Sequence, residues 1–511
     1  MRMVWTVLAV LGLAACASIP SDFDQVPSRT WPQPDSTRLG QFFAAYAPDD
    51  PSLTGVYLLD DPRDAFRARF MSAALAEKTL DLQYYLWKDD VAGRLLLYRA
   101  LEAADRGVQV RILIDDIYHA GRDELYATLD VHPHLEIRVF NPMGSRGVGR
   151  LPNLAYHKGT LDHRMHNKIC LVDGAVAVLG GRNIGDDYFG VDPELNFRDL
   201  DVLAVGPAAQ QAGEAFDAYW NSPRAVPIAA LRDDPIGDDE LAALRRDLEN
   251  ALDALDVLPY AVPIEFDATR ERLAQLAENL IWAETEIVVD SLERFQSGSV
   301  SAFVELADRI ASSVERDVLI FTAYLIPGDD GIRMFDELTD RGVRVRLLTN
   351  SMQSNNHRAV HAHYIKHRDD LLEAGVELYE LRADSELIEH FEQFDDRISE
   401  SHSGLHAKAF VVDGRLSMIG SFNMDPRSRI WNSEIGLLID SEAFAATVLE
   451  VMERELEPDN SYRVSLDEDG DLVWTASGPD GPQTWDREPG STGWERFMLR
   501  LMSWVPMENE L

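Results

Sequence analysis

An internal duplication constrains the fold of this 511-residue chain more than any other feature of its sequence. The segment Asp105–Leu113 (DRGVQVRIL) returns 235 residues later as Asp340–Leu348 (DRGVRVRLL). The tripeptide His166-Asn167-Lys168 returns 240 residues later as His406-Ala407-Lys408, in the same order within each half. Repeated matches at nearly one spacing indicate two copies of one structural unit.

Each copy has the hydrophobic pattern of alternating helices and strands. Leu95–Arg106 has helical spacing, and Val108–Ile114 is a continuous apolar run, which is typical of a strand buried on both faces. This order of elements predicts an α/β fold.

The duplicated tripeptide begins a longer motif with chemically useful side chains. On a strand, a histidine and a lysine two residues apart face the same side. The Asp-Gly pairs at 173–174 and 413–414 predict hairpin turns that return a glycine and an asparagine beside them. Each half therefore offers an imidazole, an ammonium and a carboxamide on one patch. The catalytic candidates are His166, Lys168, Asn183, His406, Lys408 and Asn423, with Asp173 and Asp413 supporting the turns.

Two such patches facing each other predict a phosphodiester site. Displacement at phosphorus needs a nucleophile on one side and a proton donor at the leaving oxygen on the other. We expect one histidine to form a covalent phosphohistidine, while the lysines and asparagines hold the non-bridging oxygens. Buried acidic residues must orient the imidazoles, and Asp201 and Glu434, in strand-like runs after the asparagines, are the candidates.

The duplicated motif resembles the phospholipase D superfamily, from about Gly55 to the C-terminus. The segments that narrow the resemblance are Gln83–Trp87, Gly180–Asp186, Phe197–Asp201 and Gly420–Ser428, which are similar to bacterial cardiolipin synthases of the lipoprotein-type C group. The resemblance implies two pseudo-twofold-related lobes, each a mixed β-sheet flanked by helices, with one active site at their seam. It also implies that His166 is the nucleophile and His406 the general acid.

The implied activity is phosphatidyl transfer that makes cardiolipin from two phospholipids. The donor would be phosphatidylglycerol or phosphatidylethanolamine, and the acceptor a phosphatidylglycerol. The alternative is a phospholipase D that uses water as acceptor and releases phosphatidic acid, because the motifs are the same for both. A nuclease and an envelope-binding lipoprotein without turnover are further alternatives.

A second group of histidines lies outside the motifs. His357 and His361, and His363 and His367, have the i, i+4 spacing of helical metal ligands, but no complete ligand set is evident. We therefore expect no metal and a polar helix near the mouth of the site. Because this stretch resembles the substrate entrance of the family, His361 and Tyr364 are candidate head-group contacts. No cofactor is expected, since no glycine-rich nucleotide loop follows a strand.

The N-terminus predicts export and lipid attachment. Arg2 precedes an apolar run, Val4–Leu13, and Leu13-Ala14-Ala15-Cys16 resembles a bacterial lipobox in which Cys16 is lipidated. The alternatives are an ordinary signal peptide and a buried first helix. Several acyl chains would hold the protein durably on a membrane of the bacterial cell envelope, inner or outer.

The net charge of the chain limits the classes of partner that it can bind. With 48 basic and 88 acidic residues the net charge is −40, which argues against a nucleic-acid partner, because phosphate contacts need clustered Lys and Arg. Such an acidic protein is also repelled by anionic phospholipid, so attachment through a lipid anchor would be needed to offset that repulsion. The oligomeric state stays open.

At the C-terminus an apolar stripe at helical spacing is expected to pack against the lobes, with the bilayer surface as the alternative. Its members are Trp494, Phe497, Met498, Leu501 and Met502.

These features divide the chain into five parts. The expected parts are a signal peptide (1–16), a tether (17–37), a first lobe (38–225), an acidic connecting segment (226–262) and a second lobe (263–511).

Overall fold

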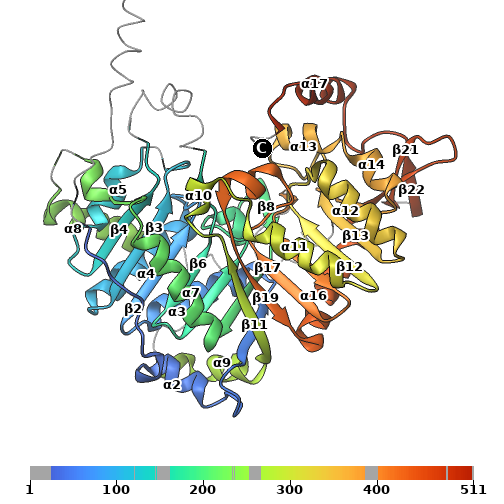
Figure 1. Cartoon of the computed structure of the whole chain (residues 1–511). Helices are drawn as coiled ribbons and strands as arrows, with labels where there is room; N and C mark the ends of the chain where they lie inside the picture. Colours follow the sequence, from blue (N-terminus) through green and yellow to red (C-terminus); the bar gives the residue numbers. More distant parts are fainter. Residues whose placement is uncertain are drawn as a thin grey trace, which may run out of the picture.

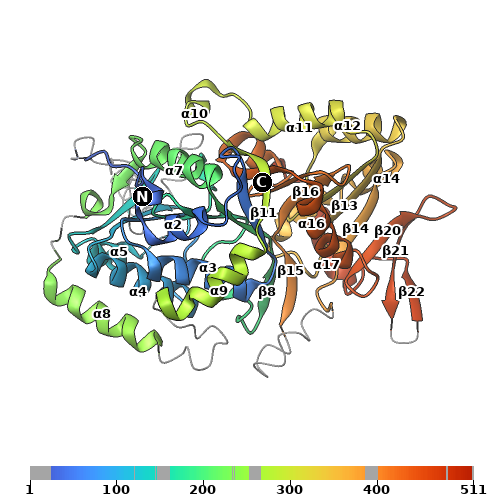
Figure 2. The same ribbon diagram turned by 90° about the horizontal axis from the view of Figure 1, so that it is seen from below.

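The computed structural model describes residues 23, 25–119, 121–143, 146, 162–232, 234, 236–252, 266–385, 401–478 and 481–508 (Figures 1 and 2). The lipobox with Cys16 lies outside the described residues.

The first lobe is a mixed sheet with helices on its faces (Figure 1). The strands β2 (Thr79–Tyr84), β3 (Gln109–Asp115) and β4 (Leu135–Phe140) run parallel, and the hairpin that carries the first motif adds antiparallel strands beside β2. In order across the sheet, the strands are β10 (Ala225–Pro227), β4 (Leu135–Phe140), β3 (Gln109–Asp115), β2 (Thr79–Tyr84), β6 (Ile169–Val172), β7 (Val176–Gly180), β9 (Asp201–Val205) and β1 (Thr54–Leu59). The helices include α2 (Arg38–Ala44), α3 (Pro62–Leu75), α4 (Val91–Asp105), α5 (Asp123–Leu129) and α7 (Pro207–Trp220).

The second lobe repeats this plan and extends it with a C-terminal meander. Its strands, in order across the sheet, are β11 (Ile281–Val289), β19 (Ile435–Asp440), β17 (Leu416–Gly420), β16 (Lys408–Val412), β12 (Asp317–Thr322), β13 (Arg344–Asn350), β14 (Glu377–Leu381), β20 (Ser461–Leu466), β21 (Leu472–Gly478) and β22 (Gly481–Trp485). Its helices include α10 (Arg294–Ser297), α11 (Ala302–Ser313), α12 (Gly328–Asp340), α13 (Arg358–Tyr364), α14 (Arg368–Glu373), α16 (Glu442–Glu455) and α17 (Gly493–Ser503).

The repeated Asp-Arg-Gly sequence ends a helix and starts a strand in each lobe. Gly107 and Gly342 have φ of 85° and 84°, a left-handed conformation that glycine adopts readily. After this glycine the backbone enters β3 in the first lobe and β13 in the second lobe, at equivalent positions of the two sheets. The two-lobed α/β architecture expected from the sequence is confirmed.

Strand β11 joins the two sheets. Its first residues pair with β1 of the first lobe, with Ile281 opposite Val56, and its later residues pair with β19, with Val289 opposite Ile435. The prediction that the second lobe begins at residue 263 is wrong, because α9 (Phe266–Glu278) packs into the core of the first lobe. Within the acidic segment, α8 (Asp238–Leu252) lies against α4 and α5 with most of its described side chains exposed.

The tether prediction is wrong for the described residues between 25 and 37. The side-chain amide of Gln25 donates hydrogen bonds to the carbonyls of Trp220 and Ser222, at 3.1 and 3.0 Å. The backbone N–H of Thr30 donates to Asp217 of α7 at 3.1 Å. The end of α7 thus offers acceptors that hold this segment on the first lobe, although its composition is typical of a linker.

The prediction for the C-terminal stripe is only partly right, because Met498 and Met502 are half-buried where α17 packs on α13 while the other three members face solvent. On α17, the side chains of Trp494, Phe497 and Leu501 are 68%, 55% and 48% exposed, and Leu499 is the one that is buried. Helical spacing of apolar residues identifies a face, but it does not tell what covers that face.

Candidate active site

Two short parallel strand pairs cross the seam between the lobes. Strand β5 (Arg164–Met165), which precedes His166, pairs with β18 (Asn432–Ser433) of the second lobe, which precedes Glu434. Strand β15 (His402–Leu405), which precedes His406, pairs with β8 (Leu195–Arg198) of the first lobe. Each motif histidine is therefore delivered next to a segment of the opposite half.

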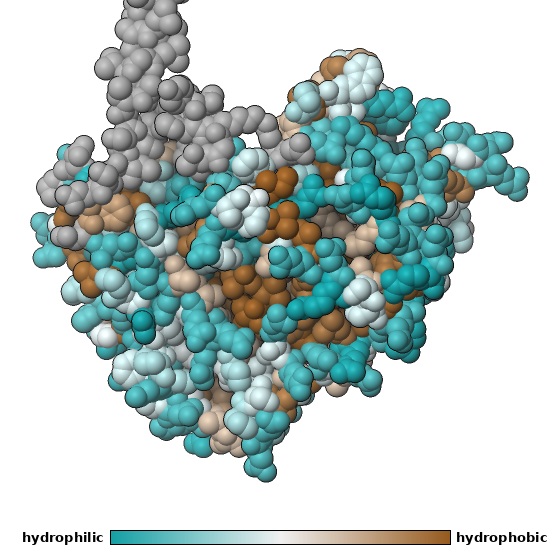
Figure 3. Space-filling view, in the orientation of Figure 1, coloured by the Kyte–Doolittle hydropathy of each residue, from teal (hydrophilic) through white to brown (hydrophobic). Residues whose placement is uncertain are grey.

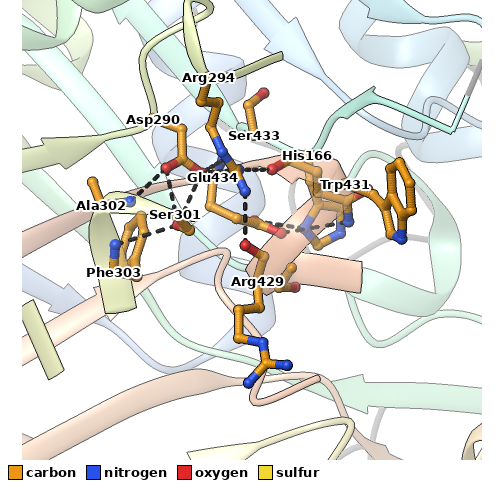
Figure 4. Close-up of polar contacts among 12 residues, drawn as sticks. His166, Asp290, Arg294, Ser301, Ala302, Phe303, Arg429, Trp431, Ser433 and Glu434 are labelled. Carbon is orange, nitrogen blue, oxygen red and sulfur yellow. Dashed lines mark hydrogen bonds and ion pairs between the residues drawn. The ribbon is translucent and has the colours of Figure 1, made fainter. Parts of the chain in front are cut away.

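The first histidine is held by a carboxylate of the second lobe. The Nδ1 atom of His166 lies 2.8 Å from Oε2 of Glu434, and the backbone N–H of His166 donates to the carbonyl of Ser433 at 2.8 Å (Figure 4). Glu434 is itself positioned, because its backbone N–H donates to Asp290 at 3.0 Å. Asp290 in turn accepts from Arg294 at 2.9 Å. Sequence reasoning identified Glu434 but not the two residues behind it.

The second histidine is held by Asp199, and not by Asp201 as the sequence analysis expected. The Nδ1 atom of His406 lies 2.6 Å from Oδ2 of Asp199. Asp201 lies inside β9, where its carboxylate forms buried ion pairs with Arg69 and Arg182 at 2.9 and 3.3 Å.

The duplication held a signal for the correct residue. Glu434 lies 235 residues after Asp199, which is the spacing of the repeated Asp-Arg-Gly segment. The choice of Asp201 relied instead on its place in a strand-like run.

The two lysines occupy equivalent buried positions. The ammonium of Lys168 donates to the carbonyl of His166 at 2.6 Å, and that of Lys408 donates to the carbonyl of His406. Each also lies over a tyrosine ring, Tyr85 at 5.5 Å and Tyr324 at 6.0 Å from the ring centroid. Neither tyrosine was predicted from the sequence, although Tyr85 directly follows β2 and Tyr324 lies two residues after the end of β12.

The two asparagines differ in their surroundings. The carboxamide of Asn183 accepts from the backbone N–H of Leu86 at 3.2 Å and donates to the hydroxyl of Tyr188 at 2.9 Å. The buried Oδ1 atom of Asn423 has no hydrogen-bond partner among the described residues. Asn423 is thus the asparagine whose side chain is less constrained by the protein.

The aspartates of the motifs hold the hairpins and do not face the histidines. Asp173 and Asp413 have φ of 54° and 53°, in the left-handed region expected for these turns. The carboxylate of Asp173 accepts from the backbone N–H groups of residues 77, 78 and 79. The carboxylate of Asp413 does the same for residues 315, 316 and 317.

Burial and the two lysines determine the protonation of the site. Burial, reinforced by Lys168 and Lys408, holds the pKa values of His166 and His406 well below the usual range. Burial raises the pKa of Glu434 to about 7 and lowers that of Lys408 to about 8. These effects favour the neutral form of both imidazoles, and because each Nδ1 is bonded to a carboxylate, each Nε2 is left to act on a ligand.

Arg427 adds a further positive charge beside the first histidine. Its guanidinium is among the groups that lower the pKa of His166, and it interacts with Tyr85 and Asp425. The corresponding position of the first lobe, 240 residues earlier, is Asp187, which pairs with Lys88 at 2.7 Å. The two halves of the site are therefore electrostatically unequal, which the motifs alone did not show.

His361 and Tyr364, the candidate head-group contacts, have polar partners within the second lobe, and a contact with a head group stays a prediction. Both side chains are buried, and His361 lies 2.5 Å from Glu488 while the hydroxyl of Tyr364 donates to Glu380 at 2.8 Å. They belong to an ion-pair network inside the second lobe.

Two further properties of the described residues concern metal and membrane contacts. In this part of the chain, no three His, Cys, Asp or Glu side chains gather as a potential metal site. None of the helices described has the length and apolar character needed to cross a bilayer.

Comparisons with known proteins agree with this geometry. A family described as cardiolipin synthase, PLD-like domain, matches residues 71–220 and 306–456, one region in each lobe. The chain is 37% identical over 464 residues to cardiolipin synthase C of Escherichia coli (strain K12), covering 90% of this chain and 96% of that protein. It is 25% identical over 405 residues to cardiolipin synthase A of Pseudomonas entomophila (strain L48), covering 79% and 68%.

One solved structure supports the fold. The crystal structure of phosphatidylserine synthase from Haemophilus influenzae Rd KW20 superposes with a TM-score of 0.54 at 10% identity, covering 88% of this chain and 93% of that one.

Proposed function

The chain belongs to the cardiolipin synthase, PLD-like domain family, and from this premise we propose that it makes cardiolipin from two phospholipids through a covalent phosphatidyl-histidine. The membership makes it a phosphatidyltransferase of the phospholipase D type. The single observation that supports the proposed mechanism best is the pair of crossed contacts, His166 with Glu434 and His406 with Asp199, beside two buried lysines.

In the first step, Nε2 of His166 attacks the phosphorus of a phosphatidylglycerol. The bond from phosphorus to the glycerol head group breaks, and His406 in its protonated form gives its Nε2 proton to the departing oxygen. Lys168 and Lys408 balance the charge on the non-bridging oxygens. The phosphate anion also opposes the two lysines, which raises the pKa of His406 and lets it carry that proton.

In the second step, the primary hydroxyl of another phosphatidylglycerol attacks the phosphatidyl group on His166. Neutral His406 takes the hydroxyl proton, the phosphorus–nitrogen bond breaks, and His166 leaves as a neutral imidazole. The sum is two phosphatidylglycerols converted to one cardiolipin and one glycerol. The burial of both histidines supports lipid over water as acceptor, since little solvent reaches Nε2.

The electrostatic asymmetry supports the order of the two histidines. Arg427 carries a permanent positive charge beside His166, and this charge favours a neutral, nucleophilic imidazole there. We therefore assign attack to His166 and proton transfer to His406.

The same proposal includes attachment to a membrane of the bacterial cell envelope. Cys16 ends a lipobox-like sequence, and a diacylglyceryl group there would keep the enzyme on the surface that holds both substrates. Labelling cells with radioactive palmitate should mark the protein, and the Cys16→Ser variant should not incorporate label. Label retained in Cys16→Ser would contradict the anchor.

A product assay tests the proposed reaction. Purified protein is incubated with phosphatidylglycerol labelled in its acyl chains, and the lipids are separated. The proposal predicts labelled cardiolipin and free glycerol, with both lost in His166→Ala. Phosphatidic acid without cardiolipin would instead support hydrolysis.

A further inference from the structure

The helix α17 presents an unusual concentration of exposed apolar surface. Figure 3 shows apolar residues on the projecting end of the second lobe where Figure 1 places α17. Among the large apolar side chains of the described residues that are exposed, five come from this helix and the turn that ends it: Trp494, Phe497, Leu501, Trp504 and Val505.

Polar contacts on both flanks of α17 hold the helix on the second lobe. A capping box joins Thr492 and Glu495 at its N-terminus. Before the helix, Glu488 accepts from Arg368 at 2.5 Å and lies 2.5 Å from His361. After the helix, the carboxylate of Glu508 pairs with Lys366 and His367 at 3.1 and 3.2 Å. The histidines that resembled metal ligands thus help to fix the two flanks of α17.

The position of α17 connects it to the active site. The helix packs on α13, and Arg358 of α13 lies 3.4 Å from Glu495 of α17. At the start of α13, the ring of His357 contacts the ring of Tyr324, with centroids 5.4 Å apart, and Tyr324 lies over Lys408. A surface bound through α17 would therefore be held one helix away from the reacting groups.

A further exposed aromatic residue lies in the first lobe, close to His166. Tyr118 is 46% exposed, and its ring contacts Tyr85, with centroids 5.3 Å apart. The ring of Tyr85 contacts His166 at 4.8 Å between centroids. Exposed aromatic side chains thus flank the paired motifs from both lobes.

We propose that the exposed face of α17 docks on a phospholipid bilayer that contains anionic lipid, and that it holds the seam of the two lobes toward that surface. Trp494 and Trp504 lie at opposite ends of the face, and tryptophan favours the boundary between head groups and acyl chains. The helix carries Arg496 and Arg500 against one acidic residue, within a chain of net charge −40. An amphipathic helix with a basic polar side is suited to an anionic lipid surface.

A second copy of the chain is a less suitable partner. A twofold contact through this face would bring the arginines of two equivalent helices toward each other. The inference rests on the proposed function only in its choice of phospholipid as partner.

Tryptophan quenching tests the docking without any turnover. The full-length protein is bound to vesicles of phosphatidylglycerol and phosphatidylcholine, in which the phosphatidylcholine carries brominated acyl chains. Bromine quenches tryptophans that reach the acyl region. The expected result is quenching of the wild type that is lost in Trp494→Phe/Trp504→Phe, a change that keeps the face apolar. Equal quenching in the two proteins would overturn the inference.

An activity comparison provides the second measurement. Phe497→Ser/Leu501→Ser should lower cardiolipin formation on vesicles roughly tenfold and leave turnover of monomeric short-chain phosphatidylglycerol unchanged. The control Tyr46→Ser/Val300→Ser removes exposed apolar groups elsewhere and should lose activity on neither substrate. Light scattering that shows a dimer dissolved by Phe497→Ser/Leu501→Ser would assign the face to a second copy and overturn the inference. Normal quenching without cardiolipin formation would contradict the proposed function alone.

Discussion

The Nδ1 atom of His406 lies 2.6 Å from the carboxylate of Asp199, a residue 207 positions earlier in the other half of the chain. The opposite exchange joins His166 to Glu434 at 2.8 Å, across 268 positions. Each half therefore completes the site of the other. Neither lobe alone contains a motif histidine together with the carboxylate that holds it, so the proposed reaction needs both lobes docked.

Two separate variants, Asp199→Asn and Asp201→Asn, should distinguish an effect on catalysis from an effect on stability. Asp199→Asn should lower kcat by about 100-fold or more, because His406 loses the carboxylate that orients it and stabilises its charged form. Its thermal midpoint should change little, since the amide fills the same space. Steady-state kinetics on vesicles and thermal unfolding provide the two readouts.

Asp201→Asn should behave in the opposite way. It removes the charge that pairs with buried Arg69 and Arg182, so unfolding should become easier by about 3–5 kcal/mol. The folded fraction should keep most of its kcat. If Asp201→Asn abolished kcat while Asp199→Asn did not, the assignment of the orienting carboxylate would be wrong.

The pH dependence should report the buried acid Glu434. Burial raises its pKa to about 7, above the unfolded value of 4.5, so folding favours the neutral acid. Its stabilising contribution is complete below about pH 4.5 and is lost as the pH rises through about 7. Activity should rise over the same range, because the ionised form accepts the Nδ1–H of His166. In Glu434→Gln the rise of kcat/KM should be absent. The loss of unfolding free energy with pH should become smaller but remain, because burial also raises the pKa of Asp425 to about 7 and that of Asp290 to about 6.

The two motif aspartates should matter for folding to different extents. Asp173→Ala leaves three backbone N–H groups near the core without their acceptor, which costs about 1–3 kcal/mol of unfolding free energy. Asp413→Ala should cost less, because its turn and the neighbouring residues 315 and 316 are solvent-accessible. Chemical denaturation measures the difference. An equal loss in both variants would contradict this explanation.

Chelation should leave the reaction intact. In the proposed mechanism Lys168 and Lys408 supply the positive charge at the phosphate oxygens, so its steps need no divalent ion. Cardiolipin formation should be unchanged after treatment with EDTA. Strong inhibition that a divalent ion reverses would contradict the mechanism.

Much of the fold, and the gathering of the motif side chains at one seam, could be predicted because the chain is duplicated. The buried strands, the Asp-Gly turns and the two sets of histidine, lysine and asparagine all follow local patterns that occur twice. The partner of His406 was missed because strand periodicity was used in place of the repeat spacing that relates Asp199 to Glu434. That each histidine takes its acid from the other half depends on lobe docking, which no local pattern encodes.

Outside the site, the structure differs from what the sequence predicts for one common physical reason: local patterns do not specify contacts with distant segments. The apolar spacing of α17 is the same for a buried and an exposed helix, so it could not predict that Trp494 faces solvent. The composition near Gln25 is that of a linker, but its placement depends on acceptors almost 200 residues away in the sequence. His361 and Tyr364 lie on a helix close to the site, but their partners Glu488 and Glu380 come from distant segments.

Trapping the covalent intermediate tests the central claim most directly. Protein is mixed briefly with phosphatidylglycerol labelled in its acyl chains, denatured, and digested for peptide analysis. The account predicts acid-labile phosphatidyl label on the peptide that contains His166, none in His166→Ala, and passage of the label into cardiolipin when unlabelled phosphatidylglycerol is added before denaturation. Cardiolipin formation at full rate without label on His166, or with label on His406, would contradict it.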